Sequence, residues 1–155
     1  MSLEMKQPII TIRDLSVTYD TVRALEHVDL DIYADDFLGI IGPNGGGKSS
    51  LVKAIMGAVE HNGEIEISDI LGYLPQVSSF DKVFPISVLE VVMSGLQAER
   101  GMLRRYGKAE RERAMATLRK AHLDHLATRP IGELSGGQLQ RVMLCRAIIS
   151  EPKLL

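Results

Sequence analysis

Nine consecutive residues combine the side chains and the backbone freedom that phosphate binding needs: Gly42-Pro43-Asn44-Gly45-Gly46-Gly47-Lys48-Ser49-Ser50. Their spacing fits the pattern G-x-x-x-x-G-K-[ST] of a phosphate-binding loop, or P-loop. A run of glycines can turn its backbone N–H groups inward around a phosphate chain, because no side chains stand in the way. We therefore expect residues 42–50 to bind phosphate groups.

Two side chains behind the glycines complete such a site. Lys48 can bring a compact positive charge to the β- and γ-phosphates of a nucleotide, and the hydroxyl of Ser49 can ligate Mg²⁺. The helix expected to begin here would also point the positive end of its dipole at the anion. A ligand-free turn between a strand and a helix would need neither the lysine nor the hydroxyl. The sequence therefore favours a bound nucleotide with Mg²⁺.

The overall composition limits the class of protein. The 155 residues are 45% hydrophobic and 25% charged, which suits one globular domain and leaves no room for two. The net charge is -2 and no run of five like charges occurs, which argues against a nucleic-acid-binding face and a polybasic membrane anchor. Cys145 is the single cysteine, which favours a reducing compartment. Because there is neither an apolar run of about eighteen residues nor a leader pattern, we expect a cytoplasmic protein.

The segments around the loop predict the elements that position it. Residues 9–17 and 25–32 alternate apolar with polar side chains, which indicates two half-buried strands paired antiparallel beside the nucleotide strand. The continuous apolar run 37–41 indicates a buried parallel strand. Apolar residues recur at helical spacing over 51–56, and Gly57 is placed to end that helix.

The middle of the chain predicts two short strands. Asn62-Gly63 is a signal for a two-residue turn, and residues 64–67 alternate as a strand would. Residues 71–74 are a second candidate strand, which Pro75 and Gln76 would end.

Three helices and a final strand are predicted beyond residue 85. Ser87 and Glu90 form the pattern of a capping box for a helix that runs to about Leu96. Residues 108–123 predict a charged amphipathic helix, whose apolar stripe is Ala114, Met115, Leu118 and Ala121. A more apolar helix follows Ser135 and runs to about Ile149, and residues 152–155 indicate the start of another strand.

A second motif begins the last of these helices. In Leu134-Ser135-Gly136-Gly137-Gln138, Ser135 can cap the helix, Gln138 can return the hydrogen bond, and the glycines expose N–H groups at a positive helix end. Alone, this pattern is only a well-made helix N terminus. Together with the P-loop upstream, it resembles the ATP-binding cassette (ABC) family of ATPases, whose signature sequence is this pentapeptide.

The resemblance covers residues 9–155 and implies ATP with Mg²⁺ as the ligands. Tyr19 matches the aromatic residue on which the family stacks adenine, and Gln76 matches the family's glutamine near Mg²⁺ and the attacking water. Lys48 and Gln76 would then act in catalysis, and Ser49 and Gln76 would lie at the metal. The residues implied around the phosphates are Gly42, Asn44, Gly45, Gly46, Gly47, Lys48, Ser49 and Ser50.

Two subunits of this family sandwich two ATP molecules head to tail. The resemblance therefore implies a homodimer, in which the signature of one subunit meets the γ-phosphate held by the P-loop of the other. The signature residues assigned in this way are Ser135, Gly136, Gly137 and Gln138.

The resemblance also implies the fold class, an α/β P-loop NTPase of the ABC ATPase type with an antiparallel β flank and a helical insertion. Residues 1–155 would form a single partial nucleotide-binding domain. Within it, residues 9–76 would be a β-rich nucleotide-binding core, 77–133 a helical insertion, and 134–155 the signature helix with the start of the Walker B strand.

The family's Walker B aspartate, and with it the C-terminal part of the core, would lie beyond residue 155. Phosphoryl transfer to water needs a fixed metal and an oriented water, and in this family those tasks fall partly to the Walker B carboxylates. We therefore expect the intact protein to be an ATPase, and these 155 residues alone not to hydrolyse ATP at the rate of a complete cassette.

Three segments narrow the resemblance to transporters. Residues 84–88, 91–95 and 131–133 are most similar to zinc and manganese uptake ATPases, with iron-chelate importers as near relatives. Apolar contacts to a membrane subunit would come from Phe80, Phe84, Pro85 and Ile86. The implied protein is an ATPase subunit that powers metal uptake, bound to integral permease subunits on the inner face of the membrane and to no nucleic acid.

Two alternatives to this function stay open. One is an ABC-type ATPase of a non-transport system, such as translation or DNA repair, although those proteins usually add a second cassette or a coiled-coil insertion. The other is a nucleotide-binding fragment without turnover.

Overall fold

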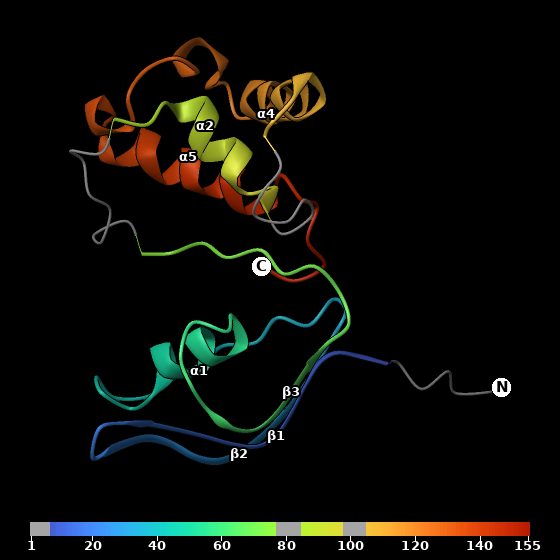
Figure 1. Cartoon of the computed structure of the whole chain (residues 1–155), viewed down its shortest axis with the longest axis vertical. Coiled ribbons are helices and arrows are strands. Elements are labelled where there is room, and N and C mark those ends of the chain that lie inside the picture. Colours follow the sequence, from blue (N-terminus) through green and yellow to red (C-terminus); the bar gives the residue numbers. More distant parts are fainter. Residues whose placement is uncertain (1–6, 77–84, 98–104) are drawn as a thin grey trace, which may run out of the picture. The chain divides into compact units, whose positions relative to one another are not determined.

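The computed structural model describes residues 7–76, 85–97 and 105–155 (Figure 1). These residues divide into two compact units, each with its own core. Unit 1 comprises Met1–Asp69 with Leu154, and unit 2 comprises Ile70–Lys153 with Leu155. No helix in the described part of the chain is both long enough and apolar enough to span a membrane.

Unit 1 is built on a three-stranded antiparallel sheet in the order β2-β1-β3 (Figure 1). The strands are β1 (Pro8–Tyr19), β2 (Val22–Tyr33) and β3 (Asn62–Ile67). β1 lies in the centre and pairs antiparallel with both neighbours. The antiparallel pair expected from residues 9–17 and 25–32 is therefore confirmed, and both strands extend beyond the expected bounds.

The apolar side chains of β1 change from even to odd positions part-way along the strand. Ile10 and Ile12 are buried, and so are Leu15 and Val17. An unbroken strand would place these two pairs on opposite faces. The register shifts between Ile12 and Leu15, and Asp14 has a positive φ of 53°. This irregularity brings Leu15 and Val17 back to the face that Ile10 and Ile12 occupy, so that both apolar pairs contribute to the core.

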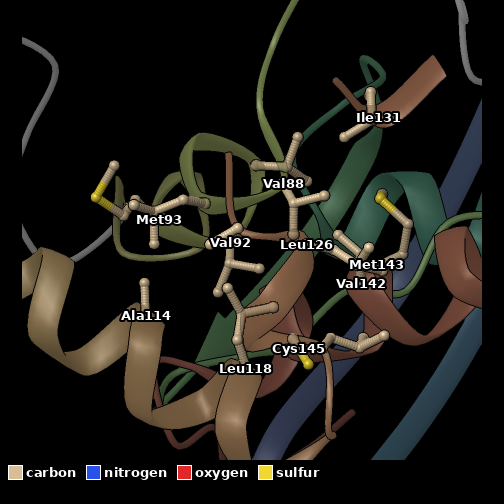
Figure 2. Packing of buried hydrophobic residues seen from close by; sticks show 14 of the residues in the cluster. Val88, Val92, Met93, Ala114, Leu118, Leu126, Ile131, Val142, Met143 and Cys145 are labelled. Carbon is tan, nitrogen blue, oxygen red and sulfur yellow. The ribbon is translucent and has the colours of Figure 1, made fainter. Parts of the chain in front are cut away.

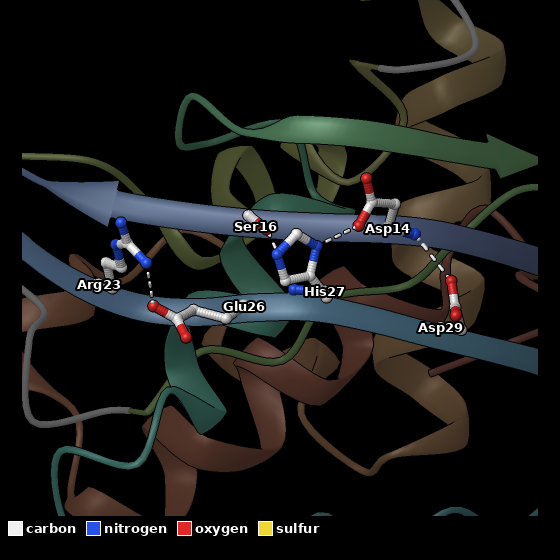
Figure 3. A network of polar contacts seen from close by, with 6 residues as sticks. All are labelled: Asp14, Ser16, Arg23, Glu26, His27 and Asp29. Atoms are coloured by element: carbon white, nitrogen blue, oxygen red, sulfur yellow. Dashed lines mark hydrogen bonds and ion pairs between the residues drawn. The ribbon is translucent and has the colours of Figure 1, made fainter.

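Side chains on both strands hold the irregularity in place (Figure 3). The N–H of Asp14 donates to Asp29 Oδ1 at 2.7 Å, and the N–H of His27 donates to Ser16 Oγ at 3.0 Å. The imidazole of His27 contacts the carboxylate of Asp14, and this hydrogen bond raises the pKa of His27. These contacts satisfy backbone groups that the shifted ladder leaves unpaired.

The expected turn at Asn62-Gly63 is wrong, because both residues belong to β3. Asn62 pairs with Ser16, beyond the register shift of β1. Gly63 has a φ of 89°, and a Cβ on it would lie 2.4 Å from the carbonyl oxygen of Asp14. Glycine is thus needed here for a close approach to the irregular part of β1. The strand predicted over 64–67 is confirmed within β3.

The expected buried strand over 37–41 is not formed. The segments 71–74 and 152–155 form no strand either, although Leu71 and Leu154 each take part in a single β-bridge. Phe37 and Ile41 are almost fully exposed. A parallel strand receives its ladder hydrogen bonds only from neighbouring strands. The one sheet in the described residues is β2-β1-β3, which includes none of these segments. Their apolar sequence is therefore insufficient to make them strands.

Unit 2 is helical and packs around one apolar cluster (Figure 2). Its helices among the described residues are α2 (Val88–Ser94), α4 (Lys108–Lys120) and α5 (Gly136–Ile148), with short 3-10 turns at η2 (Asp124–Leu126) and η3 (Ile131–Glu133). α2 contacts both α4 and α5. The predicted apolar stripe of α4 faces this core, since Ala114 and Leu118 are fully buried and Met115 and Ala121 pack against it.

The three predicted helices of unit 2 are confirmed, with small differences in their ends. α4 stops at Lys120 rather than residue 123, because His122 takes a positive φ of 56°. Both predicted capping boxes form. Ser87 and Glu90 cap α2, and Ser135 and Gln138 cap α5.

We expect Ser87→Ala to lower the free energy of unfolding by about 1 kcal/mol at neutral pH. Ser87 Oγ accepts from the N–H of Glu90 at 3.3 Å and donates to Glu90 Oε2 at 2.5 Å. The hydroxyl and the N–H of Ser87 both donate to the Glu90 carboxylate and lower its pKa, so the stabilisation from these two bonds is present above the unfolded pKa and is lost as the pH falls. The cost of the substitution should therefore shrink below about pH 4.

Thermal unfolding of the full chain at several pH values measures this effect. Ser87→Thr is the control, because it keeps the hydroxyl. Equal melting temperatures for Ser87→Ala and Ser87→Thr at neutral pH would contradict the prediction.

Candidate functional site

Residues 42–47 form a compact loop that leads directly into α1 (Lys48–Ile55). The N–H of Gly46 donates to the carbonyl oxygen of Pro43 at 3.1 Å, which tightens the loop. The N–H of Leu51 donates to the carbonyl oxygen of Gly47 at 2.9 Å, which is the first helical bond of α1. The expected order of glycine-rich loop and helix is confirmed, and Gly57, with a φ of 64°, follows the end of α1 as predicted.

The side chain of Lys48 folds back over the loop. Its ammonium group donates to the carbonyl oxygens of Gly42 at 2.8 Å and Pro43 at 2.6 Å. An ammonium carries three donors, so these two bonds leave one N–H for another acceptor. The positive charge is thus already held at the loop.

The N terminus of α1 has the features that an anion site needs. Gly47 is the N-cap residue, no side chain caps the helix, and the first turn contains no acidic residue. The first N–H groups of a helix have no intrahelical partner and carry a partial positive charge. The space beside Gly42 and Gly45 is open, since a Cβ at either position would meet nothing within 4 Å. The donor set therefore fits the phosphates of a nucleotide, and Ser49, which is exposed, supplies a hydroxyl beside them.

Backbone packing fixes the loop against β2. A Cβ on Gly47 would lie 2.3 Å from the carbonyl oxygen of Ala24 and 2.6 Å from Leu25 Cδ2. Gly47 also has a φ of 77°, in the region that favours glycine. Glycine is therefore required at position 47 for two reasons, its backbone conformation and its close contact with the neighbouring strand.

Tyr19 lies on the same hairpin as this contact. Tyr19 ends β1 and pairs with Val22, while Val17 pairs with Leu25. Tyr19 is thus two residues, roughly 7 Å, along the strand from the residue that faces Leu25. Tyr19 as a whole residue is 41% exposed. The structure therefore places an accessible aromatic ring at the end of unit 1 that carries the loop.

The signature residues lie in unit 2, at the start of α5. The N–H of Ser135 donates to Gln138 Oε1 at 3.0 Å, and the N–H of Gln138 donates to Ser135 Oγ at 3.3 Å. Gly136 and Gly137 are exposed, with nothing within 4 Å of an added Cβ. By helix geometry, their N–H groups have no partner within α5. Ser135 accepts in this cap and so keeps its O–H for donation.

Gln76 also belongs to unit 2 and ends the irregular segment 71–76. The residues predicted to contact a membrane subunit lie just beyond it. Phe80 and Phe84 are outside the described residues, whereas Pro85 is exposed and Ile86 packs against the core of unit 2. The P-loop and Tyr19 thus belong to unit 1, and Gln76 and the signature belong to unit 2.

Residues 25–155 match the sequence profile of a protein family described as ABC transporter. The chain belongs to this family. The match includes the P-loop and the signature helix, and it confirms the resemblance that these two motifs carry.

Curated relatives in the ABC family share this part of the sequence. The manganese transport system ATP-binding protein MntB of Listeria monocytogenes is 38% identical over an alignment of 146 residues, which covers 88% of this chain and 61% of the relative. MntB of Bacillus subtilis is 40% identical over 148 residues, covering 90% and 59%. The zinc uptake system ATP-binding protein ZurA of Listeria innocua is 36% identical over 159 residues, covering 95% and 62%. The chain thus spans 59–62% of the length of these relatives.

Solved ABC structures share the fold. An inward-facing ABC transporter of metal-chelate type aligns with a TM-score of 0.79 at 32% identity, covering 94% of this chain and 57% of that chain. A dimeric ATP-binding cassette bound to ADP and phosphate aligns with a TM-score of 0.75 at 27% identity, covering 93% and 71%. The expected fold class, an α/β P-loop NTPase of the ABC ATPase type with an antiparallel β flank and a helical region, is confirmed.

Sequence reasoning missed several residues that hold these motifs. Ala24 and Leu25 support the P-loop through Gly47, and Arg113 Nη2 donates to the carbonyl oxygen of Ile149 at the end of α5. Both contacts join residues that are far apart in the sequence, so no local sequence pattern predicts them. The even-to-odd change between Ile12 and Leu15 was the one available signal for the irregular strand that carries Tyr19.

Gly47→Ala is expected to lower the free energy of unfolding by at least about 2 kcal/mol. The added methyl group would overlap the carbonyl oxygen of Ala24, and alanine is strained at a φ of 77°. Gly46→Ala is the matched control. Its Cβ would meet Pro43 at 3.1 Å without positive φ, so we expect a loss below about 1 kcal/mol.

Thermal unfolding of both variants in the full chain, followed by circular dichroism, provides the measurement. Equal melting temperatures for Gly46→Ala and Gly47→Ala would show that the contact with β2 is unimportant.

Proposed function

We propose that the protein is the ATP-binding and ATP-hydrolysing subunit of an ABC transporter that takes up a transition metal ion, manganese or zinc. The observation that carries the ATPase part is the arrangement at residues 42–49. An open glycine loop meets a helix N terminus without acidic residues, and the Lys48 ammonium is already held at the loop. Such a site binds the phosphate chain of a nucleotide.

The P-loop would hold the phosphates and Tyr19 the adenine. The N–H groups of the loop and of the first turn of α1 would donate to phosphate oxygens, with the remaining Lys48 donor directed at the β- and γ-phosphates. The other residues that we assign to the phosphates are Gly42, Asn44, Gly45, Gly46, Gly47 and Ser50. The ring of Tyr19, exposed on the hairpin that supports Gly47, is available for stacking against a base.

Mg²⁺ would be held through the hydroxyl of Ser49, which follows Lys48 and is exposed. We also assign to the ion the side-chain carbonyl oxygen of Gln76. Both are oxygen ligands, which Mg²⁺ prefers. When bound, the ion would neutralise charge on the phosphates. Lys48 and Gln76 are the residues to which we assign catalytic roles.

The signature would complete the site in a head-to-tail dimer. Ser135 keeps a donor, and the N–H groups of Gly136 and Gly137 lie at a helix N terminus with no acidic residue in its first turn. Gln138 is engaged in the cap, so it would contribute mainly by fixing Ser135. A second copy of the protein would present these groups to the γ-phosphate. A dimeric cassette with ADP and phosphate is known among the structural relatives.

The names of the relatives support the metal as cargo and a membrane partner. MntB is a manganese transport protein and ZurA a zinc uptake protein, and both are named ATP-binding proteins of transport systems. We therefore propose that the protein binds integral permease subunits and works in the cytoplasm, peripherally on the inner face of the membrane. The metal-chelate transporter among the structural relatives is less identical, at 32%.

Lys48→Ala is expected to weaken MgATP binding at least about tenfold. A hydrogen bond to a charged group contributes roughly 1.5–3 kcal/mol, and 1.4 kcal/mol corresponds to a factor of about ten. Isothermal titration calorimetry of the full chain measures the affinity. Lys53→Ala is the matched control, because Lys53 lies in the last turn of the same helix and is exposed. Equal MgATP affinities for Lys48→Ala and Lys53→Ala would contradict the assignment of Lys48 to the nucleotide-binding site.

In cells, Lys48→Ala at the native gene should abolish uptake of radiolabelled manganese or zinc under metal limitation. The reason is that transport would depend on energy from the nucleotide held by Lys48. Lys53→Ala should retain uptake. Unchanged uptake of both metals in the Lys48→Ala strain would remove the metal assignment while leaving the calorimetric result standing.

A further inference from the structure

The C-terminal end of α2 touches α5 at one very close point. A Cβ on Gly95 would lie 2.0 Å from the carbonyl oxygen of Arg146 and 2.6 Å from Ile149 Cγ2. Gly95 has an ordinary helical φ of -65°, so its backbone conformation does not require glycine. The requirement is for space alone. Any larger residue here would push the two helices apart.

A hydrogen bond joins α2 and α5 at the same place. Arg146 Nε donates to Ser94 Oγ at 3.0 Å, and Ser94 Oγ donates to the carbonyl oxygen of Val91 at 2.7 Å. Both side chains are partly buried, so the hydrogen bond is shielded from water. Residues 94 and 95 therefore hold α5 through one side chain and one carbonyl group of Arg146.

Two further elements contact the same turn of α5. Arg113 of α4 donates to the carbonyl oxygen of Ile149 at 2.9 Å. A Cβ on Gly72 would lie 2.7 Å from the carbonyl oxygen of Ala147, so the segment that leads to Gln76 also packs here. We call residues 146–149 the α5 terminal turn. It joins α2, α4 and the Gln76 segment to the helix that begins with the signature.

The other end of α2 is tied to the chain that leads into the signature. The N–H of Val88 donates to the carbonyl oxygen of Arg129 at 3.0 Å, and the N–H of Leu89 donates to that of Ala127 at 2.9 Å. The N–H of Ile131 donates to the carbonyl oxygen of Ile86 at 3.0 Å. α2 thus contacts the segment before α5 and also the end of α5. A displacement of α2 has to move α5 with it.

We propose that Ser94, Gly95 and Arg146 are positioning residues for ATP hydrolysis, which act by fixing the orientation of α5 and so of Ser135, Gly136 and Gly137. This inference rests on the proposed function. α5 has 13 residues, a length of about 20 Å, so a tilt of about 5° at its terminal turn would move the signature by about 1.7 Å. A misplacement of about 1 Å can cost about a hundredfold in rate.

The test is made on the intact ATPase together with its transporter partners. Gly95→Ala should lower kcat between about tenfold and a hundredfold. The Kd for MgATP, measured below the melting temperature of the variant, should stay close to wild type, because the P-loop belongs to unit 1. Gly107→Ala is the matched control. Its Cβ would meet only the flexible end of Glu110 in the same unit, at 3.2 Å.

Ser94 gives a second test that adds no bulk to the helix contact. Ser94→Ala removes the hydrogen bond to Arg146 and should lower kcat, whereas Ser94→Thr keeps the hydroxyl and should restore it. This pair decides the question if Gly95→Ala does not fold.

Two results would overturn the inference. One is wild-type turnover in both Gly95→Ala and Ser94→Ala. The other is a loss of kcat that comes with an equal loss of MgATP binding, which would indicate general unfolding. Failure of the proposed function is recognised separately, because the wild-type protein itself would then neither bind nor hydrolyse ATP.

Discussion

The contact between Gly47 and the carbonyl oxygen of Ala24 is the constraint on which unit 1 depends. It fixes the start of α1 against β2, and β2 pairs with the strand that ends at Tyr19. Only glycine satisfies it, because the residue must have a positive φ and leave room for a backbone oxygen. The glycine-rich motif therefore does more than free its own N–H groups. It also fixes the distance between the phosphate loop and the hairpin.

The same kind of backbone approach recurs where the strands are irregular. Gly63 of β3 packs against the carbonyl oxygen of Asp14, where the buried side chains of β1 change from even to odd positions. Without that change, Leu15 and Val17 would face away from Ile10 and Ile12, and that face of the sheet would lose two buried apolar side chains. The polar contacts of Asp14 and His27 support the change but are exposed to solvent. We infer that burial of the four apolar residues, rather than the ion pair, keeps the irregular register.

Local patterns were enough to predict the helices and the candidate site. The capping boxes at Ser87 and Ser135, and the loop before Lys48, depend on residues three or four positions apart, so the sequence shows them directly. The strands predicted over 37–41 and 71–74 are not formed, and local patterns could not show this. An apolar run becomes a strand only when a neighbouring strand supplies its hydrogen bonds, and the described sheet supplies none.

Contacts between distant segments were also beyond the sequence. The approach of Gly95 to Arg146 joins residues on two helices, and neither residue has a local signal that distinguishes it. Gly95 lies within the helix predicted to run to about Leu96, and the sequence gives it no role there. The structure shows that it serves packing, because its φ is that of any helical residue while a Cβ on it would overlap the carbonyl oxygen of Arg146. The sequence therefore revealed the motifs of the candidate site, but it did not reveal the contacts that orient them.

The two motifs share one physical arrangement, in which each is held by its own neighbours yet retains a donor. Lys48 gives two of its three donors to Gly42 and Pro43, which leaves one for a phosphate oxygen. Ser135 accepts from Gln138 and so retains its O–H. Neither group has to break a protein contact before it can meet an anion. Donors that are already oriented need little reorganisation when charge develops on a phosphate, and this is the condition under which electrostatic stabilisation is most effective in catalysis.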